Sequence, residues 1–370
     1  MNITGKITGI PYKILLSENL RVVDINDFNI NDVNPSCIVK DGKHSFAVSK
    51  WVSPKRTRSY PYERVYNTLN FSRKITIIPI IKDEGLDGDR DFIQWDTVSL
   101  MSLLDVFVVF AYYDEAVKNP EYSNKITGFK FDNKYILSKI QQIAQYHSSA
   151  LHWNLNELNS NLHSIITKAK TAYTKIEKQT GVNLHNIRGL DNFKTKIGKE
   201  VETFMQFSRE KAAKAQSLEI LTAQPKESLS TLTKAKITIT NYLGGQYFFT
   251  VDEVEIKDNT VYLIEGKHSK NSILPSKGDI KDGLLKMILY SNLVDVRVDG
   301  VKMEAQAALK LTSEKLKGEI SSNIPIENRS AFLLDNAFSQ EQIRFIDNLL
   351  EEAVENGFEV KINNNMTLKC

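Results

Sequence analysis

The sequence has few of the features that mark secreted, zinc-binding or membrane proteins. Its 370 residues include 2 cysteines, Cys37 and Cys370, which provide neither a disulfide framework nor the ligand spacing of a zinc site. No apolar run approaches the roughly 18 residues that suggest a membrane-spanning helix, and the N-terminus has no basic segment followed by an apolar core. We therefore expect a protein of the reducing cytoplasm, with no membrane span and no secretory signal.

A strong excess of charge of one sign is also missing. The formal net charge is +3, from 48 Lys and Arg residues against 45 Asp and Glu residues. This value is mild for a nucleic-acid enzyme, but local clustering of charge matters more for binding than the total. With 41% hydrophobic residues the chain can build a substantial core, and its length predicts two or three domains.

The stretch 248–271, FFTVDEVEIKDNTVYLIEGKHSKN, predicts two adjacent strands that bring acids together. The first strand alternates apolar and polar residues and ends in a group of acids, Asp252, Glu253 and Glu255. A polar turn at 257–260 precedes a strand that is apolar on both faces and leads into Glu265, Gly266 and Lys267. Burial of such a strand does not require a carboxylate and an amine at its end, so we expect a functional site there.

This pattern resembles the PD-(D/E)XK nuclease superfamily, in which an Asp on one strand is followed on the next by Glu or Asp, any residue, and Lys. Within that superfamily the surroundings are most similar to a type II restriction endonuclease, although Val251 stands where the family often has Pro. The resemblance implies that Asp252, Glu265 and Lys267 are catalytic. It also implies that Mg²⁺ binds Asp252, Glu265 and the carbonyl of Gly266, with Glu253 or Glu255 as alternatives for the first acid.

The residue types suit phosphodiester hydrolysis. Magnesium prefers one or two carboxylates together with water and phosphate oxygens, and it activates water near neutral pH. Lys267 would orient the attacking water and help to deprotonate it, since a partly desolvated Lys beside a cation has a lowered pKa. His268 could serve as an extra proton carrier, or it could be a solvated or DNA-contacting side chain.

The residues after the motif support a nuclease core. The run 279–292 has the apolar spacing of a helix, so the predicted order is strand, strand, helix. The following stretch, 301–311, suits a strand or a helix. We therefore expect an α/β protein with a restriction-endonuclease-like mixed-sheet catalytic core. A similar run of letters, Asp41 to His44, lies between two short strands and predicts a hairpin turn instead.

A basic and aromatic stretch, 50–66, offers candidate contacts to double-stranded DNA. Basic residues interleave there with Trp51, Tyr60, Tyr62 and Tyr66, a mixture suited to phosphate contacts and groove insertion. The alternative is a solvated loop that leads into a helix at Tyr62. The DNA-binding candidates are Lys50, Lys55, Arg56, Arg58, Arg64, His268 and Lys270.

The chain divides into three predicted segments. Residues 1–131 form an N-terminal α/β region for DNA recognition, with strands at 10–16, 20–25, 37–39, 46–52, 74–81 and 105–113 and a helix near 95–104. Residues 132–189 form a helical linker or hairpin, and 190–370 form the catalytic domain, which closes with a capped helix and a strand at 358–362.

One long helix is expected over 151–176, where apolar residues alternate steps of four and three. Its narrow seam suits an intramolecular hairpin or a homodimer. A second helix is expected over 191–221, on which Glu202 or Glu219 would either assist the metal or be a surface charge.

Overall fold

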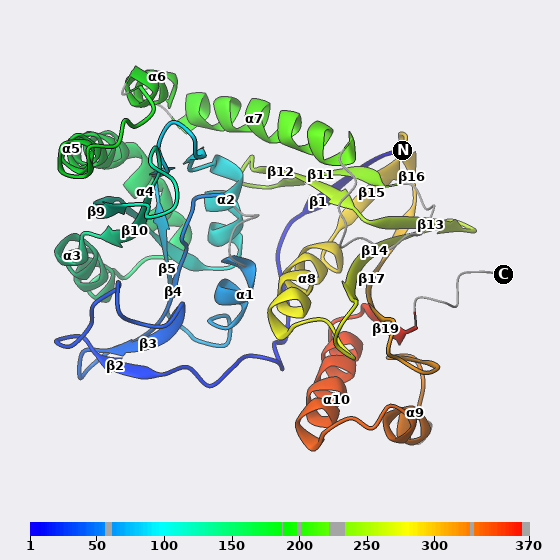
Figure 1. Ribbon diagram of the computed structural model, residues 1–370. Helices are drawn as coiled ribbons and strands as arrows, with labels where there is room; N and C mark the ends of the chain where they lie inside the picture. The colour runs from blue at the N-terminus through cyan, green and yellow to red at the C-terminus, as the bar shows by residue number, and fades with distance from the viewer. Residues whose placement is uncertain (56–60, 187, 198–200, 222–233, 326–328, 365–370) are drawn as a thin grey trace. The chain divides into compact units, whose positions relative to one another are not determined.

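The computed structural model describes residues 1–55, 61–186, 188–197, 201–221, 234–325 and 329–364 (Figure 1). It is a mixed α/β protein that divides into two compact units, one of residues 18–210 and one of residues 1–17 and 211–370. This division differs from the three predicted segments. The helices of 132–189 pack in the same unit as the preceding strands, and the first residues of the chain supply a strand to the other unit. No helix within the described ranges is long and apolar enough to cross a membrane.

The unit of residues 18–210 contains a five-stranded sheet in the order β2-β3-β4-β5-β8, in which only β3 and β4 are antiparallel neighbours. Its strands are β2 (Val22–Asp24), β3 (Ser36–Lys40), β4 (Ser45–Lys50), β5 (Lys74–Pro79) and β8 (Val106–Ala111). Two small antiparallel pairs accompany it, β6 (Ile81–Asp83) with β7 (Arg90–Phe92) and β9 (Tyr113–Lys118) with β10 (Ile126–Phe131). Every residue of β8 is buried, as its apolar run predicts.

The helices of this unit are α1 (Pro61–Tyr66), α2 (Trp95–Leu103), α3 (Asn133–Ala144), α4 (Ala150–Ser160), α5 (Leu162–Thr180) and α6 (Arg188–Ile197). The prediction of one helix over 151–176 is wrong, because Asn161 ends α4 and begins α5. Asn competes with the helical backbone for hydrogen bonds, and the Asn161 amide here donates to the Glu157 carboxylate. Helix α5 packs against β9, and the seam residues Ile165, Ala169, Ala172 and Ile176 are buried within the chain.

The unit of residues 1–17 and 211–370 contains two five-stranded sheets. The first has the order β12-β11-β1-β15-β16, with β1 (Asn2–Ile7), β11 (Ala235–Asn241), β12 (Gln246–Val251), β15 (Val294–Val298) and β16 (Val301–Lys302). Strand β1, which was not predicted, is the dark blue strand beside the yellow-green β11 (Figure 1), and it pairs in parallel with it. The strand predicted at 10–16 does not form. The backbone N–H groups of Leu15 and Leu16 instead donate to the carboxylate of Glu352.

The second sheet of this unit has the order β13-β14-β17-β19-β18. Its strands are β13 (Glu253–Lys257), β14 (Thr260–Ser269), β17 (Glu304–Ser313), β18 (Glu319–Ser321) and β19 (Glu359–Asn363). The region 301–311, for which the sequence allows a strand or a helix, is therefore extended. The predicted order of strand, strand and helix is confirmed for β13, β14 and the helix after them, but the predicted first strand, which continued through 251–255, is divided at Asp252 between β12 and β13.

Among the described residues, the helices of this unit are α8 (Lys277–Tyr290), α9 (Arg329–Asp335) and α10 (Gln340–Glu355). A further helix, α7 (Val201–Leu221), begins in the unit of residues 18–210 and ends in this one. Helix α8 packs against β14 and β17, and α10 packs against β19 (Figure 1). Ser276 caps α8 by accepting from the N–H of Asp279, and Ser339 with Gln342 forms the predicted capping box of α10.

Candidate functional site

Asp252 lies at the point where the chain leaves one sheet of this unit and enters the other. Strand β12 pairs with β11 as far as Val251, and β13 begins its pairing with β14 at Glu253. Strand β14 continues beyond that pairing, so the N–H of Gly266 has no partner strand on this side. The Asp252 carboxylate takes that place, because its Oδ2 atom accepts the N–H of Gly266 at 3.0 Å.

The carbonyl of Gly266 is directed toward the same edge. The N–H and C=O groups of one residue project to the same side of a strand, and the N–H of Gly266 points to Asp252. The carbonyl therefore lies on the side of β14 where β13 has not yet begun to pair. A backbone oxygen and a carboxylate thus lie at one open edge of the strand.

Glu265 and Lys267 lie on one face of β14, because alternate residues of a strand point the same way. Helix α8 covers this face and brings a second lysine. The Lys267 ammonium is 3.0 Å from Glu265 Oε1, and the Lys286 ammonium of α8 is 2.8 Å from Glu265 Oε2. Asp282, one turn earlier on α8, is 3.7 Å from the Lys267 ammonium. The cluster therefore joins two residues of the strand to two of the helix.

Gly283 explains how α8 comes so close to β14. A Cβ atom at this position would lie 2.8 Å from Leu309 Cδ1, 3.3 Å from Lys267 Cε and 3.8 Å from Glu265 Cγ. The first distance is too short for real atoms and the second is tight, so the glycine leaves the space that the Lys267 side chain uses.

The pKa values of the two acids of the motif are shifted in opposite directions. Burial, together with the negative charge of Glu265, raises the pKa of Asp252 to about 7. Burial would also raise the pKa of Glu265, but the ammonium groups of Lys286 and Lys267 outweigh it and lower that pKa to about 2. At pH 7 Glu265 is therefore an anion, while Asp252 is divided between its two forms.

The pKa of Lys267 differs from the sequence expectation. Burial lowers the pKa of its ammonium group, but the charges of Glu265 and Asp282 and the hydrogen bond to Glu265 together outweigh burial, so the net direction is upward. The expected lowering presumed a cation beside the lysine, whereas its neighbours here include the carboxylates of Glu265 and Asp282. Burial raises the pKa of Asp282 in turn.

The other candidates for the first acid have different partners. Glu253 is buried and its Oε2 atom accepts from the Lys310 ammonium at 3.0 Å. Glu255 forms an ion pair of 2.8 Å with Lys257. Of the three acids, Asp252 is the one that is hydrogen-bonded to the segment of Glu265 to Lys267.

The basic and aromatic stretch is built largely into the fold of its own unit. The Lys50 ammonium donates to the carbonyl of Ile30 at 2.7 Å, and the Arg64 guanidinium donates to the carbonyl of Lys50 at 2.8 Å. The expectation of groove insertion is wrong for three of the rings, which are buried in the core: Trp51, Tyr62 and Tyr66. Lys55 is exposed, whereas Arg56, Arg58 and Tyr60 lie outside the described residues.

His268 and Lys270, which were predicted as DNA contacts, do not join the cluster. His268 has its Nδ1 atom 2.9 Å from the Thr312 hydroxyl, and Lys270 is exposed at the end of β14. Glu202 is exposed on α7, and the side chain of Glu219 lies outside the described residues.

Asp282 and Lys286 were missed in the sequence. Their signal is a carboxylate and an amine four residues apart within a helix whose other positions are mostly apolar. The similar run at 41–44 forms the predicted hairpin turn between β3 and β4, where Asp41 accepts the N–H groups of Lys43 and His44.

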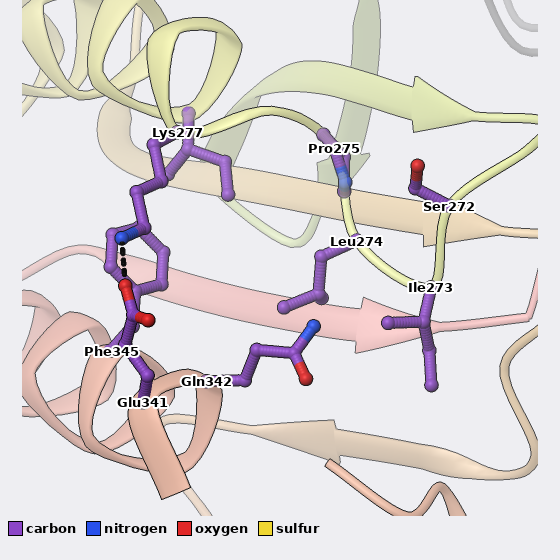
Figure 2. Close-up of a pocket in the computed structure, with 9 residues that line it drawn as sticks. Ser272, Ile273, Leu274, Pro275, Lys277, Glu341, Gln342 and Phe345 are labelled. Atoms are coloured by element: carbon purple, nitrogen blue, oxygen red, sulfur yellow. Dashed lines mark hydrogen bonds and ion pairs between the residues drawn. The ribbon is translucent and has the colours of Figure 1, made fainter. Parts of the chain in front are cut away.

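A small hollow of about 130 Å³ lies between the first turns of α8 and α10 (Figure 2). Apolar side chains line most of it, and the ion pair of Lys277 with Glu341 spans one side at 2.6 Å. The charged groups that reach this hollow thus neutralise each other, so the candidate chemistry stays with the cluster on β14.

Comparison with known proteins adds no assignment. No family model matches the chain, and neither a curated protein nor a solved structure matches it.

Proposed function

We propose that this chain is a type II restriction endonuclease that hydrolyses phosphodiester bonds of double-stranded DNA with Mg²⁺, on a restriction-endonuclease-like core. The observation that carries the proposal is the bond of Asp252 to Gly266 beside the ion pair of the buried Glu265 with Lys267. Two carboxylates with unlike proton affinities and a lysine are held together there by a strand and a helix. Such a concentration of perturbed ionisable groups is typical of catalytic sites.

The donor set suits Mg²⁺. Asp252 offers its second oxygen, for which no described residue is a hydrogen-bond donor, and its bond to the N–H of Gly266 brings it close to the Gly266 carbonyl and to the preceding residue of β14, Glu265. The described residues contain no group of three or more His, Cys, Asp or Glu side chains placed to hold a metal. Mg²⁺ does not need such a group, because one or two carboxylates with water and phosphate oxygens satisfy it. When bound, it would supply charge neutralisation at the phosphate and a more acidic water.

The residues of the chain have separate parts in this proposal. Asp252 and Glu265 bind the cation as carboxylates, so Asp252 must be ionised. Lys267, which its raised pKa keeps as an ammonium, would bind and orient the attacking water and stabilise the hydroxide that remains when the proton of that water passes to the solvent. Asp282 holds the Lys267 ammonium from the helix side, at 3.7 Å.

Target recognition belongs, in this proposal, mainly to the unit of residues 18–210, with His268 and Lys270 contributing from the other unit. Lys55, His268 and Lys270 are the remaining candidate DNA contacts that the structure describes, since Lys50 and Arg64 donate to backbone carbonyls. A palindromic target would require a homodimer, because two-fold protein symmetry matches the symmetry of the site.

The test is incubation of the purified protein with long unmethylated DNA of known sequence, with Mg²⁺ or with a chelator. Glu265→Gln should lower the cleavage rate by about 100-fold or more, because it removes a charged ligand. Glu255→Gln is the matched control, since Glu255 is paired with Lys257 on the neighbouring strand. Discrete fragments that require Mg²⁺ and disappear only in Glu265→Gln are the expected result.

Two alternatives give different results in this assay. A smear of fragments that requires Mg²⁺ would indicate a repair nuclease or junction resolvase. The other alternative is a noncatalytic DNA-binding or scaffold protein. One observation favours it, because two lysines already neutralise Glu265 without any metal. Absence of cleavage for every DNA tested would select that alternative.

A further inference from the structure

The carboxylate of Glu265 is fully occupied by ammonium groups. Its Oε1 atom lies 3.0 Å from the Lys267 ammonium and its Oε2 atom 2.8 Å from the Lys286 ammonium. Glu265 is 1% exposed, so water cannot replace a lost partner easily. A cation that binds Glu265 must therefore displace one of these two lysines.

Lys286 is the ammonium that can leave at the lower cost. Lys267 has a second carboxylate in reach, Asp282 at 3.7 Å, which holds it in place. For Lys286, Glu265 is the only carboxylate of the described residues within ion-pair distance. Lys286 also comes from the helix, whereas Lys267 and Glu265 share one strand.

The net charge of the cluster indicates which group the displaced lysine would pair with. Together with Asp252, the cluster has three carboxylates, Asp252, Glu265 and Asp282, and the two ammonium groups of Lys267 and Lys286. With all of them ionised, a divalent cation would leave one excess positive charge in a largely buried site, which is unfavourable. One phosphate group cancels that charge, and it offers the Lys286 ammonium an anionic partner in place of Glu265.

We propose that Lys286 is an internal counterion of Glu265 that competes with the metal cation and moves to a DNA phosphate when substrate binds, so that cation binding and DNA binding strengthen each other. This inference rests on the proposed function and adds a regulatory property to the same site. Such coupling keeps the cation weakly bound until a phosphate is present. By linkage, the cation must then increase the affinity for DNA by the same factor.

The test is a Mn²⁺ titration of the protein without DNA, followed by electron paramagnetic resonance of the free ion. Lys286→Met should bind Mn²⁺ about 10-fold more tightly than the wild type, because a charged hydrogen bond no longer competes. Lys286→Arg keeps the positive charge and should stay close to the wild type. The control is Lys277→Met on the same helix, whose ammonium pairs with the exposed Glu341.

A second measurement examines the coupling itself. Fluorescence anisotropy with a labelled random-sequence duplex gives the DNA affinity with Ca²⁺ and with a chelator. Ca²⁺ should increase the affinity of the wild type by a larger factor than that of Lys286→Met. Circular dichroism of each variant establishes that it is folded, and Lys286→Gln, which also removes the charge, takes the place of Lys286→Met if that variant is not.

The outcomes separate this inference from the proposed function. If Mn²⁺ binds Lys286→Met no more tightly than the wild type while the wild type cleaves DNA, the counterion role is refuted and the nuclease stands. If Lys286→Met binds Mn²⁺ more tightly than the wild type and Lys286→Arg does not, the result supports the role of the positive charge. If Glu265→Gln binds Mn²⁺ as well as the wild type does, Glu265 is not a ligand, and the proposed function and this inference fail together.

Discussion

Replacement of Asp252 by Asn should stabilise the unit of residues 1–17 and 211–370 above pH 7, and under the proposed function it should abolish cleavage. The carboxyl group is held where its charge is unfavourable, since burial and the charge of Glu265 raise its pKa from 3.8 to about 7. An amide of the same shape can still accept the N–H of Gly266, so the contact at 3.0 Å survives the change. What the substitution removes is the cost of ionising a buried acid.

The sign of the effect follows from the two pKa values. Between them the folded protein keeps a proton that the unfolded chain has released, so stability falls as the pH rises from about 4 to 7. Below this window the cost is absent, and above it the cost is constant. One pKa unit corresponds to about 1.4 kcal/mol, which sets an upper limit of about 4 kcal/mol for the full shift. Partial solvation of the ionised carboxylate reduces this, and we expect about 2 kcal/mol at pH 8.

The assay must follow the unfolding of the unit that contains Asp252. The 3 tryptophans are Trp51, Trp95 and Trp153, all in the unit of residues 18–210, so their fluorescence does not follow the site. Urea series at pH 5 and pH 8, each followed by a deuterium pulse at one fixed pH, give the unfolding of peptides from 246–269 by mass spectrometry. Glu255→Gln is a control whose effect on stability should have the opposite sign, because the hydrogen bond of Glu255 with Lys257 lowers the pKa of Glu255. An Asp252→Asn protein that is less stable than the wild type at pH 8, or equally stabilised at pH 5, would refute the reasoning.

Two further predictions concern packing around the site. Gly283→Ala should lower cleavage by at least about 10-fold, because the added methyl group lies 3.3 Å from Lys267 Cε and 2.8 Å from Leu309 Cδ1. The gain in helix propensity of about 1 kcal/mol offsets much of the overpacking cost, so its melting temperature should change little. Gly9→Ala, which meets nothing within 4 Å, is its control, and unchanged kinetics would contradict the assigned role of Gly283. Lys310→Met should destabilise the unit by about 3 kcal/mol in urea, since it leaves the buried carboxylate of Glu253 without its partner at 3.0 Å. The double variant with Glu253→Gln should recover most of that loss, and equal stability of the single and double variants would contradict the pairing.

The residues that could be predicted from sequence are those whose roles depend on neighbours in the chain. Alternation and the apolar run give β13 and β14, the helical spacing gives α8, and the turn residues give the hairpin at Asp41. The break at Asn161 was missed because the apolar spacing continues through it, while a side-chain hydrogen bond to Glu157 accompanies the end of α4. The roles of Trp51 and Tyr62 were misjudged because composition does not show whether an aromatic ring faces the core or the solvent.

Asp282 and Lys286 illustrate a different limit. A polar pair four residues apart on a helix usually forms a solvated ion pair with itself. Here the two side chains have separate partners on β14, and the spacing alone does not distinguish these cases. The distinction depends on which face of α8 meets the strand, and Gly283 sets how closely they meet.

The position of Asp252 depends on the first residues of the chain. Asp252 is fixed by the end of β12, β12 is paired with β11, and β11 is paired in parallel with β1 at residues 2–7. The segment that follows α8 also packs closely against β1. A Cβ on Gly5 would lie 3.0 Å from Leu293 Cδ2 and 3.6 Å from Val296 Cγ2. The strand that positions the first acid and the helix that brings Lys286 are thus both tied to β1. A pairing between residues 2–7 and 236–241 leaves no local pattern in either segment. The geometry of the site therefore depends on a contact that no reading of the motif alone could reveal.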